Sequence, residues 1–312
     1  MGKSGIEISV IGLGTMYFGS KVEERTSFRL MDLYLEHGGN FIDSANKYAS
    51  WFPGCIGGES ERLIGKWLRQ QGQSGDLILS SKVGFSYCDI PRSLNKEIII
   101  SECEKSLGRL GVETIDLYFA HAYDEHTPIE ETMEAFYRLK KAGKIRFAGA
   151  SNYMGWRLEE ANGVAASQQW EGYCCLQQRH TYLEPSVRAG FGNQSVLTPE
   201  IVDLCTKRKL AIMAYSPLLG GIYGKEDADI PPQYQSLASS QKLASLRELG
   251  SDTGYSNNQL VLSWMLHSIP VVIPLVTGSN EQQLKENLEA ASIKLSEEDM
   301  EKLDFPVIKA NK

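Results

Sequence analysis

Four side chains with acid–base chemistry stand at or just after short apolar runs in the first half of the sequence. Asp43 ends one such run and Tyr48 follows five residues later. Lys82 ends the next run, and His121 comes directly after the run that follows it. Taken singly, each has an ordinary explanation, because an aspartate can cap a turn, a lysine can be a solvated charge, and a histidine or tyrosine ring can pack in a core. Their joint occurrence at successive run ends is what indicates a site.

Together these side chains suit hydride transfer to or from a carbonyl group. The carbonyl oxygen needs an acid that protonates it as the alkoxide develops, and a phenol with a pKa of about 10 is poorly matched to neutral pH. A lysine ammonium beside the phenol is expected to lower the pKa of the phenol, and a carboxylate keeps that ammonium charged and oriented. We therefore expect Tyr48 to handle the proton, Lys82 and Asp43 to tune it, and His121 to orient the substrate oxygen.

The elements that position these residues alternate along the chain between apolar runs and amphipathic helical stretches. Strands are predicted at 10–13, 41–43, 77–82, 115–120, 145–150, 172–177, 210–215 and 271–275. Helices are predicted at 23–36, 59–70, 96–109, 129–141, 157–166, 199–207, 257–267 and 281–289. Repeated strand–helix units predict an α/β fold with a parallel sheet, and eight units allow closure into a single (β/α)8 barrel over residues 1–312. The strand ends then meet at one mouth, where the four side chains are expected.

The composition excludes several classes of partner. With 42% hydrophobic and 23% charged residues the chain has ordinary globular values. Its formal charge of −7 and the lack of a Lys/Arg cluster oppose nucleic-acid binding. The longest apolar runs are too short to span a membrane, and no signal-peptide pattern is present. We expect a cytoplasmic protein with a small-molecule partner; no feature predicts an oligomeric state.

Two alternative sites fit the sequence less well. His121 and His126 lie five residues apart, whereas a helical pair of metal ligands needs three or four, and the six cysteines include no C-x-x-C pair. We therefore predict no metal site and reduced thiols. Gly12 and Gly14 suggest a dinucleotide-binding fingerprint, but Tyr17 stands where its third glycine should be, and the predicted helix does not begin directly at the glycine turn.

Over nearly its whole length the chain resembles the aldo-keto reductase superfamily. The matching segments are FIDSANKY (41–48), GGESERLIGKWL (57–68), SSKVG (80–84), SLGRLGVETIDLYFAH (106–121), TPIEETMEA (127–135), GKIRFAGASN (143–152), AYSPL (214–218) and QLKENL (283–288). The resemblance implies a (β/α)8 barrel and a nicotinamide-dependent oxidoreductase acting on a carbonyl or alcohol substrate. It places the catalytic tetrad of the family on the same four residues that the chemistry selected.

The resemblance also implies the residues that bind the cofactor. Ser151, Asn152 and Gln177 would surround the nicotinamide carboxamide, and Tyr215 would stack on its ring. The residues expected along the pyrophosphate are Ser216, Pro217, Leu218 and Gly220, and those expected at the adenosine end are Ser279, Gln283, Glu286 and Asn287. Trp51, Phe52 and Pro53 follow Tyr48 in the same loop, where they could form an apolar wall for the substrate or pack within the loop.

The sequence gives opposing signals on the choice between NADP(H) and NAD(H). Many relatives carry Arg or Lys in the last loop to hold the 2′-phosphate of NADP(H), and residues 277–287 offer only Lys285. Lys225, Lys242 or Arg247 could supply the charge instead. NADP(H) is favoured, and NAD(H) is possible.

The sequence also permits two other functions, and it contains two features without an assigned catalytic role. Lys82 could form a Schiff base in an aldolase-like barrel, or the chain could be a regulatory barrel that binds the cofactor and turns over slowly. His180 replaces an aromatic that relatives commonly carry, and packing explains it better than catalysis. The irregular segment 218–236 is either a functional cover or an insertion.

Overall fold

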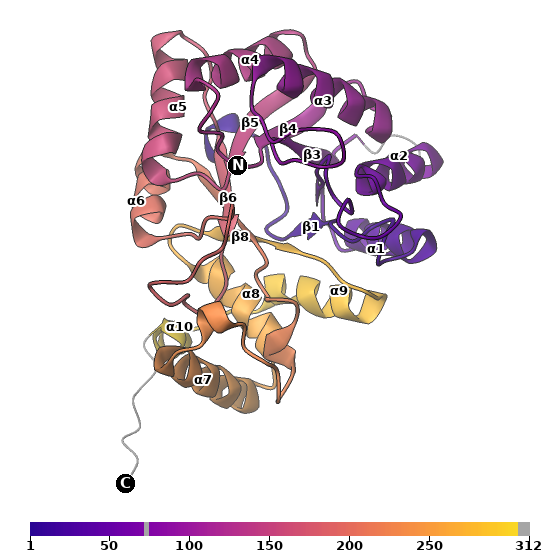
Figure 1. The fold of residues 1–312 in the computed structure, drawn as a ribbon. Coiled ribbons are helices and arrows are strands. Elements are labelled where there is room, and N and C mark those ends of the chain that lie inside the picture. Colours follow the sequence, from indigo (N-terminus) through magenta and orange to yellow (C-terminus); the bar gives the residue numbers. More distant parts are fainter. Residues whose placement is uncertain (72–74, 305–312) are drawn as a thin grey trace.

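The computed structural model describes residues 1–71 and 75–304 of the 312-residue chain. Its centre is a closed barrel of parallel strands that follow one another in sequence order, as Figure 1 shows. The strands are β1 (Gly12–Gly14), β2 (Phe41–Asp43), β3 (Ile78–Val83), β4 (Ile115–Ala120), β5 (Ile145–Ser151), β6 (Cys175–Arg179), β7 (Ala211–Tyr215) and β8 (Val272–Val276). Pairing of β1 with β8 closes the barrel. The predicted (β/α)8 fold is confirmed.

Helices surround this barrel on the outside. The α-helices are α1 (Glu24–Glu36), α2 (Glu59–Gln71), α3 (Lys96–Leu110), α4 (Ile129–Lys141), α5 (Gly155–Ser167), α6 (Pro199–Arg208), α7 (Leu237–Thr253), α8 (Asn257–His267), α9 (Glu281–Glu289) and α10 (Glu297–Asp304). Short 3-10 turns lie at Gly2–Ser4, Ile222–Gly224, Pro232–Tyr234 and Ala290–Ser292. In Figure 1, α7 and α10 lie side by side outside the ring that the other helices form. Within the described residues, every helix is too short or too polar to cross a bilayer.

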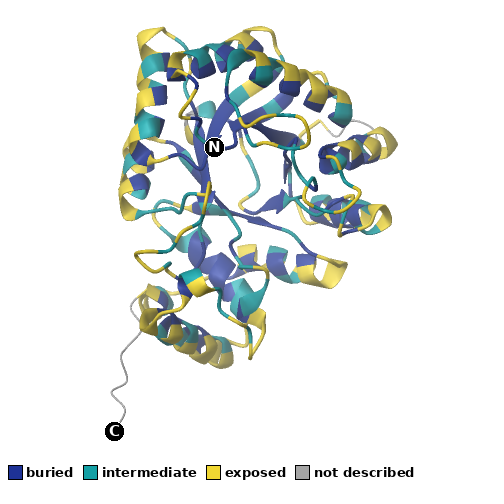
Figure 2. Ribbon diagram, in the orientation of Figure 1, coloured by how far each residue is buried: buried dark blue, intermediate teal, exposed yellow. Residues whose placement is uncertain are grey.

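Burial explains why these segments became strands and helices. Every residue of β2 and β3 is buried, which is the pattern of a parallel strand covered on both faces. Phe41, Leu117, Phe119 and Met213 fill the barrel interior, whereas α2 buries one face and exposes the other. Figure 2 shows this contrast between buried strands and the exposed outer faces of the helices.

Local signals fix the helix ends. The Asn95 side chain accepts a hydrogen bond of 2.8 Å from the Ile98 N–H and so caps the start of α3. Gly111 ends the same helix in the left-handed conformation, with φ of 71°. Because α3 begins and ends at defined points, β4 starts a fixed distance later and brings His121 to the mouth.

Two predicted strands differ from the observed ones by two or three residues at the N-terminal end. The first was expected at 10–13, but β1 is Gly12–Gly14, and Val10 is 51% exposed ahead of it. The sixth was expected at 172–177, but β6 is Cys175–Arg179. Tyr173 is buried outside the sheet, with its ring edge-on to those of Phe136 and Tyr153. An apolar residue that packs between helices therefore looked like the start of a strand.

The segment predicted as irregular, 218–236, contains two 3-10 turns, and the unpredicted helix α7 follows it. The buried face of α7 includes Ser239 and Lys242 beside Leu246 and Leu249. These polar residues interrupt the apolar periodicity on which a sequence-based prediction depends. The short helix α10 was also missed, and among its residues only Leu303 is buried.

Candidate active site

Asp43, Tyr48 and Lys82 form one hydrogen-bonded cluster at the ends of β2 and β3. Lys82 Nζ donates to Asp43 Oδ2 at 2.5 Å and to Tyr48 Oη at 3.0 Å. Its third acceptor is the Ser44 carbonyl oxygen, at 2.7 Å. The Lys82 and Asp43 side chains are 0% and 2% exposed. Adjacent parallel strands thus bring the phenol, the ammonium and the carboxylate together as expected.

The second carboxylate oxygen of Asp43 is held by two further side chains. Ser80 Oγ donates to Asp43 Oδ1 at 2.7 Å, and Gln177 Nε2 donates to the same oxygen at 3.1 Å. These bonds compensate the carboxylate for its lost hydration. Ser80 was not predicted as part of the site, although a hydroxyl in a wholly buried strand is a signal that could have found it.

The pKa of Tyr48 runs opposite to the expectation from the sequence. Burial raises the pKa of the Tyr48 phenol well above its usual value of 10, and the negative charge of Asp43 raises it further. Burial also lowers the pKa of Lys82, while Asp43 opposes that change. Desolvation of the phenolate therefore outweighs the attraction of the ammonium. The phenol is protonated near neutral pH, which is the form that can give a proton to an alkoxide.

His121 lies beside this cluster, directly after β4. The backbone N–H of His121 donates to the Val83 carbonyl oxygen at 2.8 Å. The imidazole ring packs edge-on to Phe85, with 4.6 Å between ring centres. The Tyr48 ring is 6.1 Å away, centre to centre. Burial holds the pKa of His121 well below 6.5, and the positive charges of Lys82 and a neighbouring lysine lower it further. The imidazole is therefore neutral, and its Nδ1 has no hydrogen-bond partner among the described residues.

Asn152 joins the ends of β4, β5 and β7. Its Nδ2 donates to the His121 carbonyl oxygen at 2.8 Å and to Ser151 Oγ at 3.1 Å. Its Oδ1 accepts hydrogen bonds from Tyr215 Oη at 2.7 Å and from the Ser195 N–H at 3.0 Å. The expected carboxamide-binding residues therefore lie together beside the cluster, but the Asn152 amide is already fully hydrogen-bonded within the protein.

The loop after β7 has an unusual backbone conformation. Ser216, Leu219, Gly220 and Gly221 all have positive φ, of 55°, 47°, 74° and 84°. The N–H groups of Leu218 and Gly220 donate no hydrogen bond within the described part of the chain. Turns of this kind aim backbone N–H groups at a shared point and suit anions. The segment predicted to lie along a pyrophosphate therefore fits such a group.

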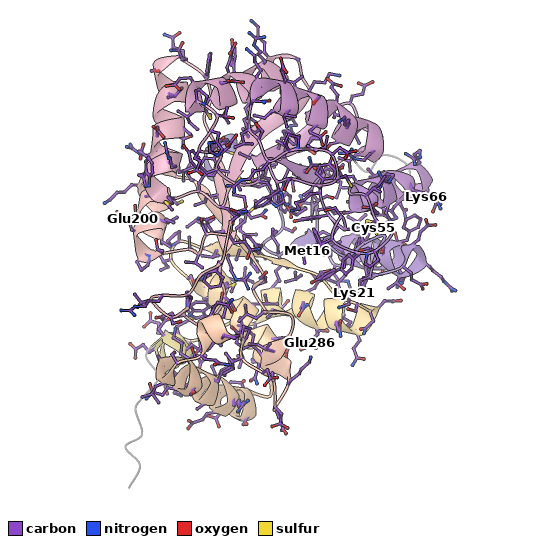
Figure 3. All side chains as sticks on the ribbon, in the orientation of Figure 1. Met16, Lys21, Cys55, Lys66, Glu200 and Glu286 are labelled. Atoms are coloured by element: carbon purple, nitrogen blue, oxygen red, sulfur yellow. The ribbon has the colours of Figure 1, made fainter. Side chains whose placement is uncertain are left out.

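The residues expected at the adenosine end lie on the segment from β8 into α9, and they are Ser279, Gln283, Glu286 and Asn287. The Ser279 N–H donates to Gln283 Oε1 at 2.9 Å. Glu286, labelled in Figure 3, accepts a hydrogen bond of 2.6 Å from Ser256 Oγ. The Thr277 hydroxyl is buried with no partner among the described residues. An unpaired buried hydroxyl in this loop leaves a donor for a ligand.

Of the cations considered for a 2′-phosphate, Lys242 is committed elsewhere. It is 8% exposed and pairs with Glu184 at 2.9 Å. Arg247 donates to a backbone carbonyl oxygen at 2.9 Å. Lys225 and Lys285 are exposed and form no ion pair within residues 1–71 and 75–304. Lys225 and Lys285 therefore remain as candidates.

Two aromatic positions singled out in the sequence take different places. Trp51 is 46% exposed and lies edge-on to Tyr48, with 6.3 Å between ring centres. His180 stacks on Trp264 at 5.6 Å, and burial lowers the pKa of His180 to about 4. Packing therefore accounts for His180, while Trp51 stands at the mouth beside the phenol.

The structure also bears on the alternative sites. Gly12 and Gly14 lie within barrel strand β1, and α1 begins only at Glu24, so these glycines do not form the strand-to-helix turn of the dinucleotide fingerprint. Asp124, between the two histidines considered as ligands, accepts hydrogen bonds from the His126 N–H at 3.0 Å and from Thr127 Oγ1 at 2.6 Å, as in a capped turn. The described residues contain no group of three His, Cys, Asp or Glu placed to bind a metal.

An aldolase-like role for Lys82 fits the geometry poorly. A Schiff-base nucleophile needs an unprotonated amine with its lone pair free. The Lys82 ammonium instead directs its three N–H bonds at Asp43, Ser44 and Tyr48. The arrangement is suited to keeping a positive charge beside the phenol oxygen.

Comparison with known proteins agrees with this geometry. Residues 10–305 match the sequence profile described as the aldo/keto reductase family. The uncharacterized oxidoreductase YrpG of Bacillus subtilis is 30% identical over 98% of this chain and 95% of its own length. The aldo-keto reductase str7 of Strobilurus tenacellus is 31% identical over 94% and 87%. The norsolorinic acid reductase stcV of Emericella nidulans is 27% identical over 96% and 79%.

Proposed function

The chain belongs to the aldo/keto reductase family, and on this premise we propose that it is an oxidoreductase that transfers a hydride between NADP(H) and a carbonyl or alcohol substrate. The observation that carries the proposal is the hydrogen bond of 3.0 Å from the Lys82 ammonium to the Tyr48 hydroxyl, with Asp43 bound to the same ammonium. A bound nicotinamide would supply or accept the hydride.

In this proposal Tyr48 is the general acid and base. During reduction its phenol gives a proton to the carbonyl oxygen as negative charge develops there. The Lys82 ammonium then stabilises the phenolate across the existing hydrogen bond, and Asp43 keeps the ammonium charged. Neutral His121, with its unpaired Nδ1, orients the substrate oxygen by a hydrogen bond from its ring. Oxidation of an alcohol uses the same groups in reverse.

The cofactor-binding residues remain part of the proposal. Tyr215, whose hydroxyl donates a hydrogen bond to Asn152, would stack on the nicotinamide ring. Ser151, Asn152 and Gln177 would surround the carboxamide of that ring. The free N–H groups after β7 would bind the pyrophosphate. NADP(H) is favoured over NAD(H) on the expectation that exposed Lys225 or Lys285 would bind the 2′-phosphate. Apparent KM values for NADPH and NADH test this preference, and a lower KM for NADH would reverse it.

A cofactor-absorbance screen across aldehydes, ketones, sugars and alcohols tests the activity. In Tyr48→Phe, kcat should fall at least about 100-fold, because the phenol supplies general acid catalysis. Tyr255→Phe, which removes an exposed hydroxyl from a residue after α7, is the matched control and should retain wild-type kcat. Cofactor binding without turnover by the wild type would favour a regulatory barrel, and a borohydride-trapped adduct on Lys82 would favour an aldolase.

A further inference from the structure

Lys47 directly precedes Tyr48 in the loop after β2. Its side-chain ammonium forms no hydrogen bond or ion pair with any residue in 1–71 or 75–304. Its one described contact is with the face of Phe85, whose ring centre lies 4.7 Å from Nζ. Burial lowers the pKa of Lys47, and no carboxylate opposes that effect. A partly buried cation without a partner is costly, and an anion bound beside it would remove much of that cost.

The charges of the neighbouring groups make this cation stand out. Lys82 and Asp43 neutralise each other, and His121 is uncharged. Lys47 lowers the pKa of His121 through its own positive charge, so it acts electrostatically on the site. These four groups together therefore carry one net positive charge, in a protein whose formal charge is −7.

The Lys47 ammonium lies close enough to His121 for one small substrate to contact both. Phe85 contacts both groups, since its ring centre lies 4.7 Å from the Lys47 ammonium and 4.6 Å from the His121 ring centre. The ammonium is therefore no more than about 9.3 Å from that ring centre, which follows from the same two contacts. Half-exposed Trp51 packs edge-on to Tyr48, the residue after Lys47. An aromatic ring is short enough to hold a carbonyl and a second substituent within this limit.

We propose that Lys47 is a specificity-determining residue that binds an anionic group, such as a carboxylate, carried on an aromatic carbonyl substrate. This inference rests on the proposed function, since it assigns a substrate class to the same site. The carbonyl lies at Tyr48 and His121, the ring lies against Phe85 and Trp51, and the anion reaches the Lys47 ammonium. Lys47 takes no part in the proton transfer.

The test compares 4-formylbenzoate with its uncharged methyl ester. In the wild type, kcat/KM should be about tenfold or more higher for the carboxylate, as expected for a hydrogen bond between charged groups. Lys47→Met keeps the length of the side chain and should lose that ratio, whereas Lys47→Arg should keep most of it. Lys207→Met removes an exposed lysine on α6 and should leave the ratio unchanged. High salt should shrink the wild-type ratio.

A binding measurement separates this inference from the proposed function. Calorimetric titration with benzoate and with benzamide, in the presence of cofactor, makes the same comparison without turnover. Tighter binding of benzoate that is lost in Lys47→Met supports the inference even if no carbonyl is reduced. Equal binding of the two by the wild type, or an unchanged ratio in Lys47→Met, overturns it.

Discussion

The ion pair between Asp43 and Lys82 should show a large coupling free energy in a double-mutant cycle. Lys82→Met leaves the Asp43 carboxylate buried; Oδ1 keeps its bonds from Ser80 and Gln177, but Oδ2 keeps only the Tyr48 hydroxyl at 3.4 Å. Asp43→Asn leaves a buried ammonium. Each single change should lower the free energy of unfolding by about 3 kcal/mol, the usual cost of one uncompensated buried charge.

The double variant Asp43→Asn with Lys82→Met removes both charges, so no charge is left unpaired. Its free energy of unfolding should fall by no more than about 3 kcal/mol, which corresponds to a coupling free energy of at least about 3 kcal/mol. Urea denaturation followed by circular dichroism measures all four proteins. Additive effects, with a loss of about 6 kcal/mol in the double variant, would refute the claim that these residues act as one buried pair.

A surface pair provides the control for this cycle. Lys207 and Asp203 are 2.7 Å apart on α6, and their side chains are 72% and 62% exposed. Their coupling free energy should not exceed about 0.5 kcal/mol. The double variant at Asp43 and Lys82 also separates stability from chemistry. Without an ammonium beside Tyr48 its kcat should stay at least about 100-fold below that of the wild type.

Two further predictions concern groups outside the cluster. The pKa of His180 is about 4 when folded and about 6.5 when unfolded, so its contribution to stability is complete above pH 6.5 and is lost as the pH falls towards 4. His180→Phe should therefore reduce the acid-induced loss in urea denaturation by about 1.4 kcal/mol per pH unit in this window; an unchanged pH slope would contradict it. Glu102, buried on α3, accepts a hydrogen bond of 2.9 Å from Asn46 in the loop of Tyr48. Glu102→Gln should lower the free energy of unfolding by about 1–3 kcal/mol and should also lower kcat. Exposed Glu104→Gln should change neither quantity. Equal behaviour of the two variants would contradict the role of Glu102 in positioning the Tyr48 loop.

The cluster of Asp43, Tyr48 and Lys82 was predictable because the fold constrains it strongly. Charged and hydroxyl side chains that end apolar runs, in a chain of alternating strands and helices, must converge once the barrel closes. Asp43 and Lys82 satisfied that condition on neighbouring strands, and their pairing followed from the topology. Tyr48 needed only five residues of loop to turn back over the same strand end.

Other features depend on contacts that residue type and spacing do not encode. The direction of the Tyr48 pKa follows from how deeply the phenol is buried, which only the packed structure reveals. Lys242 pairs with Glu184, far away in the sequence, which its residue type and spacing could not reveal. The hydrogen bonds of the Asn152 amide to three strand ends and a loop were not predictable either. Each of these features depends on a long-range partner.

Strand β3 shows how one wholly buried segment carries two separate polar networks. Successive side chains of a strand point to opposite faces. Ser80 and Lys82 therefore both reach Asp43 inside the barrel, whereas Ser81 faces outward and donates to Glu61 of α2 at 2.5 Å. Most polar groups at such depth are hydrogen-bonded, and the side chains on each face of β3 have their own partners. The two networks have separate hydrogen-bond partners, and a one-residue shift of register would exchange the faces of their side chains.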